Sequence, residues 1–263
     1  MIRDITIGQY YPVNSPMHKL DPRTKILLTF AYIIALFLVD TIWGYLGVFI
    51  ALGCAIKMSK VPIKYMIKGL KSIIVILLFT VVLNVFFTAG EHLIFEWGFI
   101  KITWEGILFA IEMGTRLVLL IVGSSLLTLT TSPIQLTDGI ESLLMPFSKL
   151  HVPAHEIAMM MSISLRFIPI LLEETDKIMK AQTARGADFE SGNIMQRAKA
   201  MIPIMVPLFI SAFRRAEDLA MAMEARCYQG GAGRTRMNKL AYETGDFIAF
   251  GFCMGYIVMC ILL

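Results

Sequence analysis

The chain has 263 residues, of which 57% are hydrophobic and only 17% are charged. A soluble domain usually carries about a quarter charged residues, so this composition favours a membrane protein. The formal net charge of +4 is too small to indicate a protein that binds nucleic acid. None of the four cysteines has the spacing of a metal site or of a disulfide framework, so we expect no metal and no cofactor in this chain.

Five apolar segments, taken in chain order, predict five transmembrane helices. They are residues 26–39, 42–56, 72–89, 106–130 and 247–263. The first two are each shorter than the ~20 residues of a typical span, and we interpret them as a hairpin with Asp40 at its tip. The residues before the first span are polar through Lys25, so no cleavable signal peptide is expected.

The charges between the spans predict the orientation. A loop at 57–71 carries five lysines and no acid, whereas 90–105 carries three glutamates and one lysine. The positive-inside rule places the first in the cytoplasm and the second outside. The chain is then a multi-pass protein of the cell membrane with a cytoplasmic N-terminus and an external C-terminus.

The polar segment 132–245 predicts a cytoplasmic region between two membrane parts. It holds 13 Lys and Arg and 12 Asp and Glu within residues 133–245. We therefore expect an all-α fold in three parts. Residues 1–131 form the N-terminal segment and four spans, 132–245 form cytoplasmic helices, and 246–263 form the last span.

Helical patterns within this cytoplasmic region predict two long helices that cross, at 154–183 and 201–228, after a shorter one at about 133–150. Pro169, Pro203 and Pro207 lie inside apolar stretches of the long helices. They should kink or break these helices, because proline removes a backbone donor and clashes with the preceding turn.

Signals of catalysis are weak. No G-x-x-x-x-G-K-[ST] occurs, so the chain should not hold ATP in a phosphate-binding loop. His151 and His155 are four residues apart, but Pro153 between them disfavours a regular helix with both at one metal. Glu173 and Glu174 fit an ion-paired helix surface better than a catalytic dyad. We expect a protein that is not an enzyme.

Glu112 and Arg116 lie within the fourth predicted span. Ionisable residues in a span are functional candidates by default. Their i,i+4 spacing also allows them to neutralise each other. Both readings, a structural pair and a contact with another subunit, stay open.

Methionine is unusually frequent, with 18 residues in the chain. Many lie in the polar region and could simply fill space between helices. They could also form an adaptable surface for several partners, because Met repacks easily. The candidates for such a surface are Met159, Met160, Met161, Met221 and Met223.

Two similar stretches, AQTARGADF (181–189) and AMEARCYQG (222–230), place Ala-Arg at the expected ends of the two long helices. An Arg in a last helical turn is favoured by the helix dipole, so each could be an ordinary cap. A guanidinium at a helix tip is also a five-donor fork suited to carboxylates on a neighbouring protein. The small residues Ala184, Gly186 and Ala225 leave room for such tips to enter a groove.

Three segments together resemble the transmembrane T components of energy-coupling factor (ECF) transporters. They are SPMHKLDPRTKILL (15–28), SLRFIPILLEETDKIMKAQTARGADF (164–189) and RRAEDLAMAMEARCY (214–228). The resemblance covers nearly the whole chain. The second motif departs from the family pattern, because Ala-Arg-Cys stands where Ala-Arg-Gly is frequent, and Cys227 could alter the local turn.

The resemblance implies an L-shaped, all-α scaffold without catalytic activity. It implies two ABC-type ATPases as partners, each with a groove for one Ala-Arg motif, and a membrane substrate-binding S component for a vitamin or trace metal. By position, the docking residues are Ala184, Arg185, Gly186, Ala225, Arg226 and Cys227, and the methionine candidates are a surface for the S component.

Two other functional classes remain to be compared with this one. A self-contained secondary transporter would need charges along a membrane path and some inverted-repeat symmetry. No repeat beyond the Ala-Arg pattern is visible in the sequence. A membrane enzyme would need a catalytic constellation, and none is convincing.

Overall fold

The computed structural model describes residues 10–39, 41–88, 92–97, 100–150, 153–189, 193–231 and 240–262. The chain divides into two compact units, which are taken one at a time below. The core unit comprises Gly8–Gly139 and Lys239–Leu263, and the hairpin unit is built on Ile140–Asn238. The boundaries expected at 131/132 and 245/246 stay predictions, and Asp40 and His151 lie outside the described residues.

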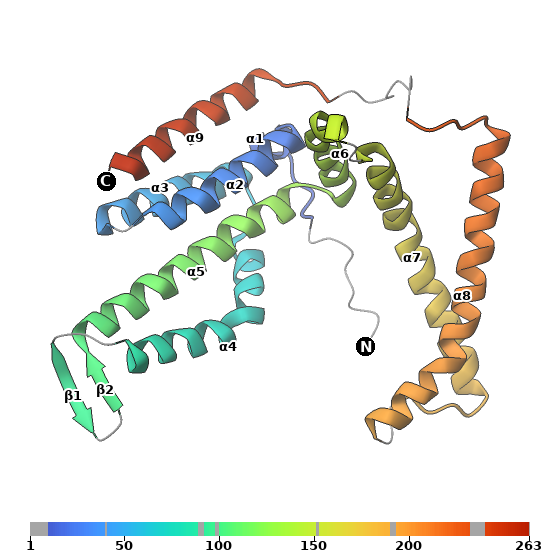
Figure 1. Cartoon of the computed structure of the whole chain (residues 1–263), viewed down its shortest axis with the longest axis horizontal. Coiled ribbons are helices and arrows are strands. Elements are labelled where there is room, and N and C mark those ends of the chain that lie inside the picture. The colour runs from blue at the N-terminus through green and yellow to red at the C-terminus, as the bar shows by residue number, and fades with distance from the viewer. Residues whose placement is uncertain are drawn as a thin grey trace. The chain divides into compact units, whose positions relative to one another are not determined.

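Helices form most of the core unit (Figure 1). In chain order they are α1 (Pro16–Lys19), α2 (Pro22–Leu38), α3 (Ile42–Ser59), α4 (Ile63–Phe87), α5 (Trp104–Thr130), the start of α6 (Pro133–Leu144), and α9 (Thr244–Leu262). A short antiparallel hairpin of β1 (Leu93–Trp97) and β2 (Ile100–Thr103) connects α4 to α5. The all-α class is confirmed, and this strand pair is an addition that the sequence analysis did not expect.

The lysine-rich segment 57–71 is a helix–turn–helix rather than a loop. α3 continues to Ser59 and α4 begins at Ile63, so Lys64, Lys68 and Lys71 are helical. Lys60 takes the left-handed conformation between them, with φ of 55°, and the two helices meet at a bend of 120°. The expectation of a loop was wrong because lysine is a good helix former and the charge pattern gives no helix boundary.

The chain is a polytopic membrane protein, although the number of spans is not fixed by helix length. Two helices, Trp104–Thr130 and Ala154–Ala184, are long and apolar enough to cross a membrane, and the bent pair α3–α4 would be a third. The second of these is the long helix that we expect in the cytoplasm. Its second half carries Glu173, Glu174, Asp176, Lys177 and Lys180. The count of five spans therefore stays a prediction.

The buried centre of the core unit joins α2, α3, α5 and α9. It contains Leu36, Val48, Leu119, Leu126 and Cys260, with Val61 and Met66 from the turn into α4. Gly123 makes a close approach possible, because a Cβ there would lie 2.2 Å from Cε1 of Tyr32. The Tyr32 hydroxyl donates to the carbonyl of Leu119 at 2.9 Å. Small residues are the usual means by which membrane helices approach this closely.

Residues 15–25 contain two capped helix starts. Ser15 accepts the backbone N–H of His18 in α1, and Asp21 accepts that of Arg23 in α2. A proline follows each cap at the first helical position, where its missing N–H costs nothing. The dipeptides Ser-Pro and Asp-Pro in this stretch are thus local signals that mark where each helix begins.

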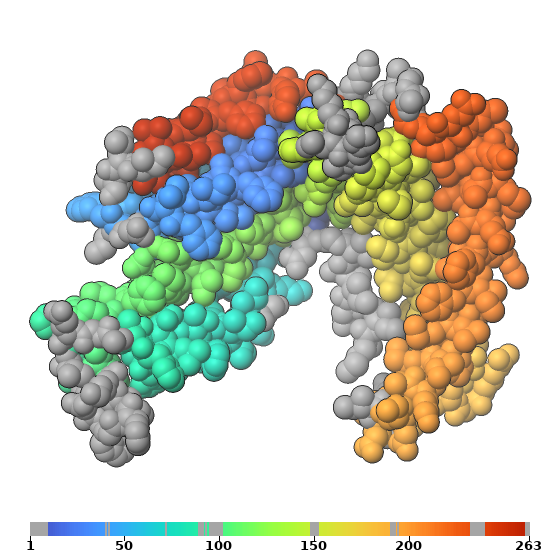
Figure 2. All heavy atoms as spheres, viewed as in Figure 1, coloured from blue at the N-terminus to red at the C-terminus, as the bar shows by residue number. Residues whose placement is uncertain are grey.

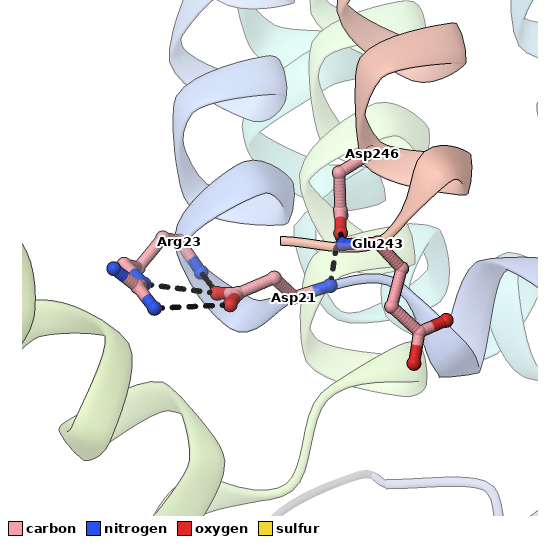
Figure 3. A network of polar contacts seen from close by, with 4 residues as sticks. All are labelled: Asp21, Arg23, Glu243 and Asp246. Carbon is pink, nitrogen blue, oxygen red and sulfur yellow. Dashed lines mark hydrogen bonds and ion pairs between the residues drawn. The ribbon is translucent and has the colours of Figure 1, made fainter. Parts of the chain in front are cut away.

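Figure 3 shows how this stretch is tied to the last helix. The buried Asp246 carboxylate accepts the N–H of Asp21 at 2.9 Å and that of Glu243 at 2.8 Å. The Asp21 carboxylate in turn binds the guanidinium of Arg23. Negative charge beside the N-termini of α2 and α9 is favoured by both helix dipoles, so residues 225 positions apart hold the two helix starts together.

The hairpin unit contains the end of α6, the 3-10 helix η2 (Met145–Leu150), α7 (Ala154–Ala184) and α8 (Ile194–Ala225). α7 and α8 cross, as Figure 1 shows, and Arg215 of α8 bonds Glu174 of α7 at 3.3 Å. Both helices continue through their prolines, as expected for two long helices, and none of the prolines breaks its helix. α8 also begins seven residues earlier than expected, where the backbone N–H of Asn193 donates to the Gln196 side chain at 3.1 Å.

Candidate docking site

The two Ala-Arg motifs end the two long helices of the hairpin unit, as expected. α7 ends at Ala184 and α8 at Ala225, so Arg185 and Arg226 are the C-cap residues. Their backbone angles are nearly the same, with φ and ψ of −86° and 5° at Arg185 and of −94° and 12° at Arg226. The sequence repeat is therefore also a structural repeat.

Each motif closes with the same hydrogen-bonded turn. In the first, the N–H of Gly186 donates to Thr183 at 2.9 Å and the N–H of Ala187 to Gln182 at 3.0 Å. In the second, the N–H of Cys227 donates to Glu224 at 2.8 Å and the N–H of Tyr228 to Met223 at 3.1 Å. This pair of bonds defines the Schellman motif, which satisfies the last carbonyls of a helix.

The turn requires a left-handed residue directly after each arginine. Gly186 has φ of +88°, and Cys227 has φ of +55°. Glycine adopts this conformation without steric cost, whereas a residue with a Cβ does so at a cost of roughly 1–2 kcal/mol. Cysteine in place of glycine thus leaves the turn unchanged and makes it less stable.

Both tips are presented to solvent. The exposed residues are Ala184, Arg185, Gly186, Ala225, Arg226 and Cys227. Neither guanidinium has an ion-pair or hydrogen-bond partner among the residues that the structure describes. Two long cationic side chains are thus exposed at helix ends.

The two tips lie at opposite ends of α8, because the chain turns back after Arg185 and then runs the length of α8 to Arg226 (Figure 1). A helix of 32 residues is up to about 48 Å long. This separation exceeds the size of one groove that could hold a helix end. A single groove that holds one helix end could therefore not contact both tips.

Comparison with known proteins assigns this arrangement. The family described as cobalt transport protein, CbiQ, matches residues 13–237. A protein of Ruminiclostridium cellulolyticum named energy-coupling factor transporter transmembrane protein EcfT is 56% identical over all 263 residues and 98% of its own length. This chain belongs to the EcfT family. EcfT proteins of Clostridium kluyveri and Bacillus subtilis are 60% and 51% identical, over 95% and 94% of the chain and 93% of each relative.

Membership of the EcfT family makes the chain the transmembrane T component of an energy-coupling factor transporter. It is a non-catalytic subunit of that transporter. The resemblance seen in the sequence is thereby confirmed.

The methionine candidates of this EcfT-family chain differ in exposure. Met160 and Met221 are exposed, whereas Met159, Met161 and Met223 are half-buried. A larger apolar surface follows one side of α8, and we call it the α8 stripe. Its exposed residues are Met201, Ile202, Met205, Val206, Phe209, Ile210 and Phe213. Their spacing of one, three and four residues is a helical period that the sequence analysis overlooked.

The structure favours the structural reading of Glu112 and Arg116. The Arg116 guanidinium is buried and donates to Glu112 at 2.9 Å, to the Tyr45 hydroxyl at 2.9 Å and to the carbonyl of Val39 at 2.8 Å. It therefore joins α5 to α3 and to the end of α2. With these bonds made inside the chain, nothing about Arg116 calls for a contact with another subunit.

No group of three or more His, Cys, Asp or Glu able to hold a metal occurs among the described residues. His155 instead bonds Glu141 at 3.1 Å and Tyr228 at 3.3 Å. These contacts join α6, α7 and the residue after the second tip. From the sequence, a metal role for His155 was disfavoured and a solvated position at a helix start was favoured. Its actual contacts could not be foreseen, because the two partners lie 14 and 73 positions away.

Proposed function

We propose that this chain is the scaffold through which two ABC-type ATPases drive a membrane substrate-binding S component. The observation that carries the proposal is a pair of identically capped, exposed arginines at opposite ends of α8, neither with a side-chain partner in the part of the chain that the structure describes. The first tip (184–186) and the second tip (225–227) would each enter a groove on one ATPase. ATP is bound by the ATPases, since this chain has no phosphate-binding loop.

Arginine suits this task for a physical reason. A guanidinium offers a rigid, planar fork to a carboxylate, which adds geometric specificity to charge attraction. The C-terminal carbonyls of α7 and α8 are satisfied by the Schellman turns, so the arginines are not needed as hydrogen-bonding caps. Each side chain can therefore be committed to a partner without loss to its own helix.

The α8 stripe is the surface that we assign to the S component. It extends over more than three turns and faces away from the protein interior, with Phe213 and Ile202 more than half exposed. A contiguous apolar strip of this kind indicates a site of protein contact. Met160 and Met221 stay candidates for the edge of the same surface, while the half-buried Met159, Met161 and Met223 would act by packing between helices.

The mechanism that we propose follows from these two contacts. ATP binding closes the pair of ATPases and displaces the two tips, and the crossed helices move with them. Movement of the α8 stripe reorients the S component, which releases a vitamin or trace metal ion inside the cell. A self-contained transporter is less well supported, because the intramembrane pair Glu112–Arg116 is committed to internal bonds.

The orientation that this mechanism needs is cytoplasmic for the N-terminus and the hairpin unit and external for the C-terminus. A cysteine at Lys64 in a background without other cysteines should resist impermeant thiol reagents in intact cells. A cysteine at Glu96 should react. The opposite labelling pattern would place both arginines on the side of the membrane without ATP and would exclude the proposal.

The deciding experiment measures the ATPases that co-purify with the tagged chain, together with substrate uptake. Arg185→Ala and Arg226→Ala should each weaken binding by about a hundredfold, the equivalent of ~3 kcal/mol for an unpaired partner charge. The double variant should nearly abolish assembly, and Arg→Lys should rescue poorly. Arg166→Ala, an exposed arginine of α7 away from both tips, is the matched control. A double variant that retains both ATPases and full uptake would refute the proposal.

A further inference from the structure

Three hydrogen-bonded polar side chains lie beside the second tip. The ring of His155, in the first turn of α7, bonds Glu141 of α6 through Nδ1 at 3.1 Å. Its Nε2 lies 3.3 Å from the hydroxyl of Tyr228. All three residues belong to the hairpin unit, and Glu141 is buried.

The chemistry of the three groups sets the direction of the two bonds. An ionised Glu141 only accepts, so Nδ1 of His155 carries the proton and donates it. The Nε2 of a neutral imidazole is then an acceptor for the Tyr228 hydroxyl. A carboxylate that fixes the orientation and tautomer of an imidazole in this way leaves the second ring nitrogen aimed at one partner.

Tyr228 connects these hydrogen bonds directly to the second tip. Its backbone N–H closes the Schellman turn onto Met223, and only Cys227 separates it from Arg226. The backbone at Gly231 packs closely against the same ring. A Cβ at this position would lie 2.5 Å from Cδ2 of His155. The second tip is therefore held from two sides by one histidine.

The first tip differs at the corresponding position. There the residue that closes the turn is Ala187, whose methyl group cannot make a hydrogen bond of this kind. The two tips share their backbone geometry but not this anchor. The difference is one of side chains around two otherwise equal turns.

We propose that Glu141, His155 and Tyr228 are positioning residues that fix the direction of the Arg226 tip and make the two ATPase contacts unequal. The inference rests on the proposed function, since it assumes that the tips dock. Motion received at Arg226 passes through Tyr228 and His155 into α6, which follows α5 along the chain after only two residues. Motion received at Arg185 passes instead along α7.

The test isolates one tip at a time. In an Arg185→Ala background only the second tip remains, and there Tyr228→Phe should weaken ATPase binding about two- to tenfold, the effect of one hydrogen bond. In an Arg226→Ala background only the first tip remains, and Tyr228→Phe should change nothing. Binding is measured by titrating the purified ATPase onto the tagged chain in detergent.

Two further variants test whether the loss arises from the bonds of His155 and Tyr228. His155→Leu removes both ring nitrogens at similar size and should reproduce the loss without adding to that of Tyr228→Phe, because both act through the same bonds. Tyr65→Phe removes an exposed tyrosine hydroxyl of α4 and should have no effect in either background.

The outcomes are distinct. A Tyr228→Phe loss of equal size in both backgrounds, or no loss in either, would overturn the positioning role while leaving the docking of both tips intact. Failure of Arg226→Ala itself to weaken ATPase binding would instead remove the proposed function, and the positioning role with it.

Discussion

Arginine does opposite things in the two units. In the core unit, Arg116 is buried and bonds Glu112, Tyr45 and the carbonyl of Val39. In the hairpin unit, Arg185 and Arg226 are exposed and have no partner among the described residues. A charge in this protein thus serves the fold where it is enclosed by its own chain, and under the proposed function it serves assembly where it is exposed at a helix end.

The largest predicted effect is the loss of stability in Arg116→Ala, which tests the structural role of the buried arginine. The substitution should lower the free energy of unfolding by about 3 kcal/mol, the lower end for a buried pair, because Glu112 keeps some access to water. The thermal midpoint of the purified protein in detergent measures the effect. Arg166→Ala, at an exposed position, should leave the midpoint unchanged. An unaltered midpoint in Arg116→Ala would show that burial of this charge does not stabilise the core unit.

The second test concerns Asp246 in the network of Figure 3. Asp246→Ala leaves the backbone N–H groups of Asp21 and Glu243 without their acceptor. We expect a loss of about 2 kcal/mol, in the range for buried donors without a partner. Asp218→Ala, at an exposed site on α8, is the matched control and should be close to neutral. Equal midpoints for the two variants would contradict a role of this network in joining α2 to α9.

A third test sharpens the likeness between the two tips. Cys227→Gly should raise stability by about 0.5–1 kcal/mol, because the left-handed conformation is strained for cysteine and free for glycine, with part of the gain lost to chain entropy. Binding of the ATPases should be retained, since the Schellman turn and Arg226 are kept. The melting curve measures the change in stability, and the co-purification assay measures the binding of the ATPases. A destabilised variant would mean that the cysteine side chain contributes packing that its exposure does not indicate.

The smallest expected effect is on pH dependence. Burial lowers the pKa of His18 below its ordinary value of 6.5, and the ring bonds Ser15 at 2.7 Å and the carbonyl of Tyr11 at 2.9 Å. The unfolded chain therefore takes up this proton first, so His18 contributes stability above about pH 6.5 that is lost as the pH falls below it. Midpoints measured between pH 7.5 and pH 5.5 should fall less in His18→Asn than in the parent. Equal falls of the midpoint in His18→Asn and in the parent would show that His18 does not cause the pH dependence.

Much of the fold could be predicted from local sequence. The Ala-Arg turns at Gly186 and Cys227 were predicted as helix ends. Ser15 and Asp21, each followed by proline, are equally local helix-start signals, but they were not used. The β1–β2 hairpin was missed although Ile100, Lys101, Ile102 and Thr103 alternate with a period of two. Their charges were used to orient the chain, and the alternation itself was not considered.

The candidate site divides in the same way. The two tips were predicted residue by residue, whereas the α8 stripe and the contacts of His155 were not. The stripe has a helical period and lies within the helix expected at 201–228, but only the methionines of this region were considered as a surface. The structure keeps α8 unbroken across Pro203 and Pro207, and only then do its apolar residues share one side.

The sequence by itself determined the membrane character of the chain, the ends of its long helices and the two arginines that close them. These features depend on composition and on bonds between residues at most five positions apart, such as Tyr228 to Met223. The tertiary structure alone decided that Arg116 is structural, that Asp246 meets Asp21, and that His155 holds Tyr228. Apart from the Arg116–Glu112 pair within α5, these contacts join residues 71 to 225 positions apart. Which of them meet depends on how the helices pack rather than on any short pattern.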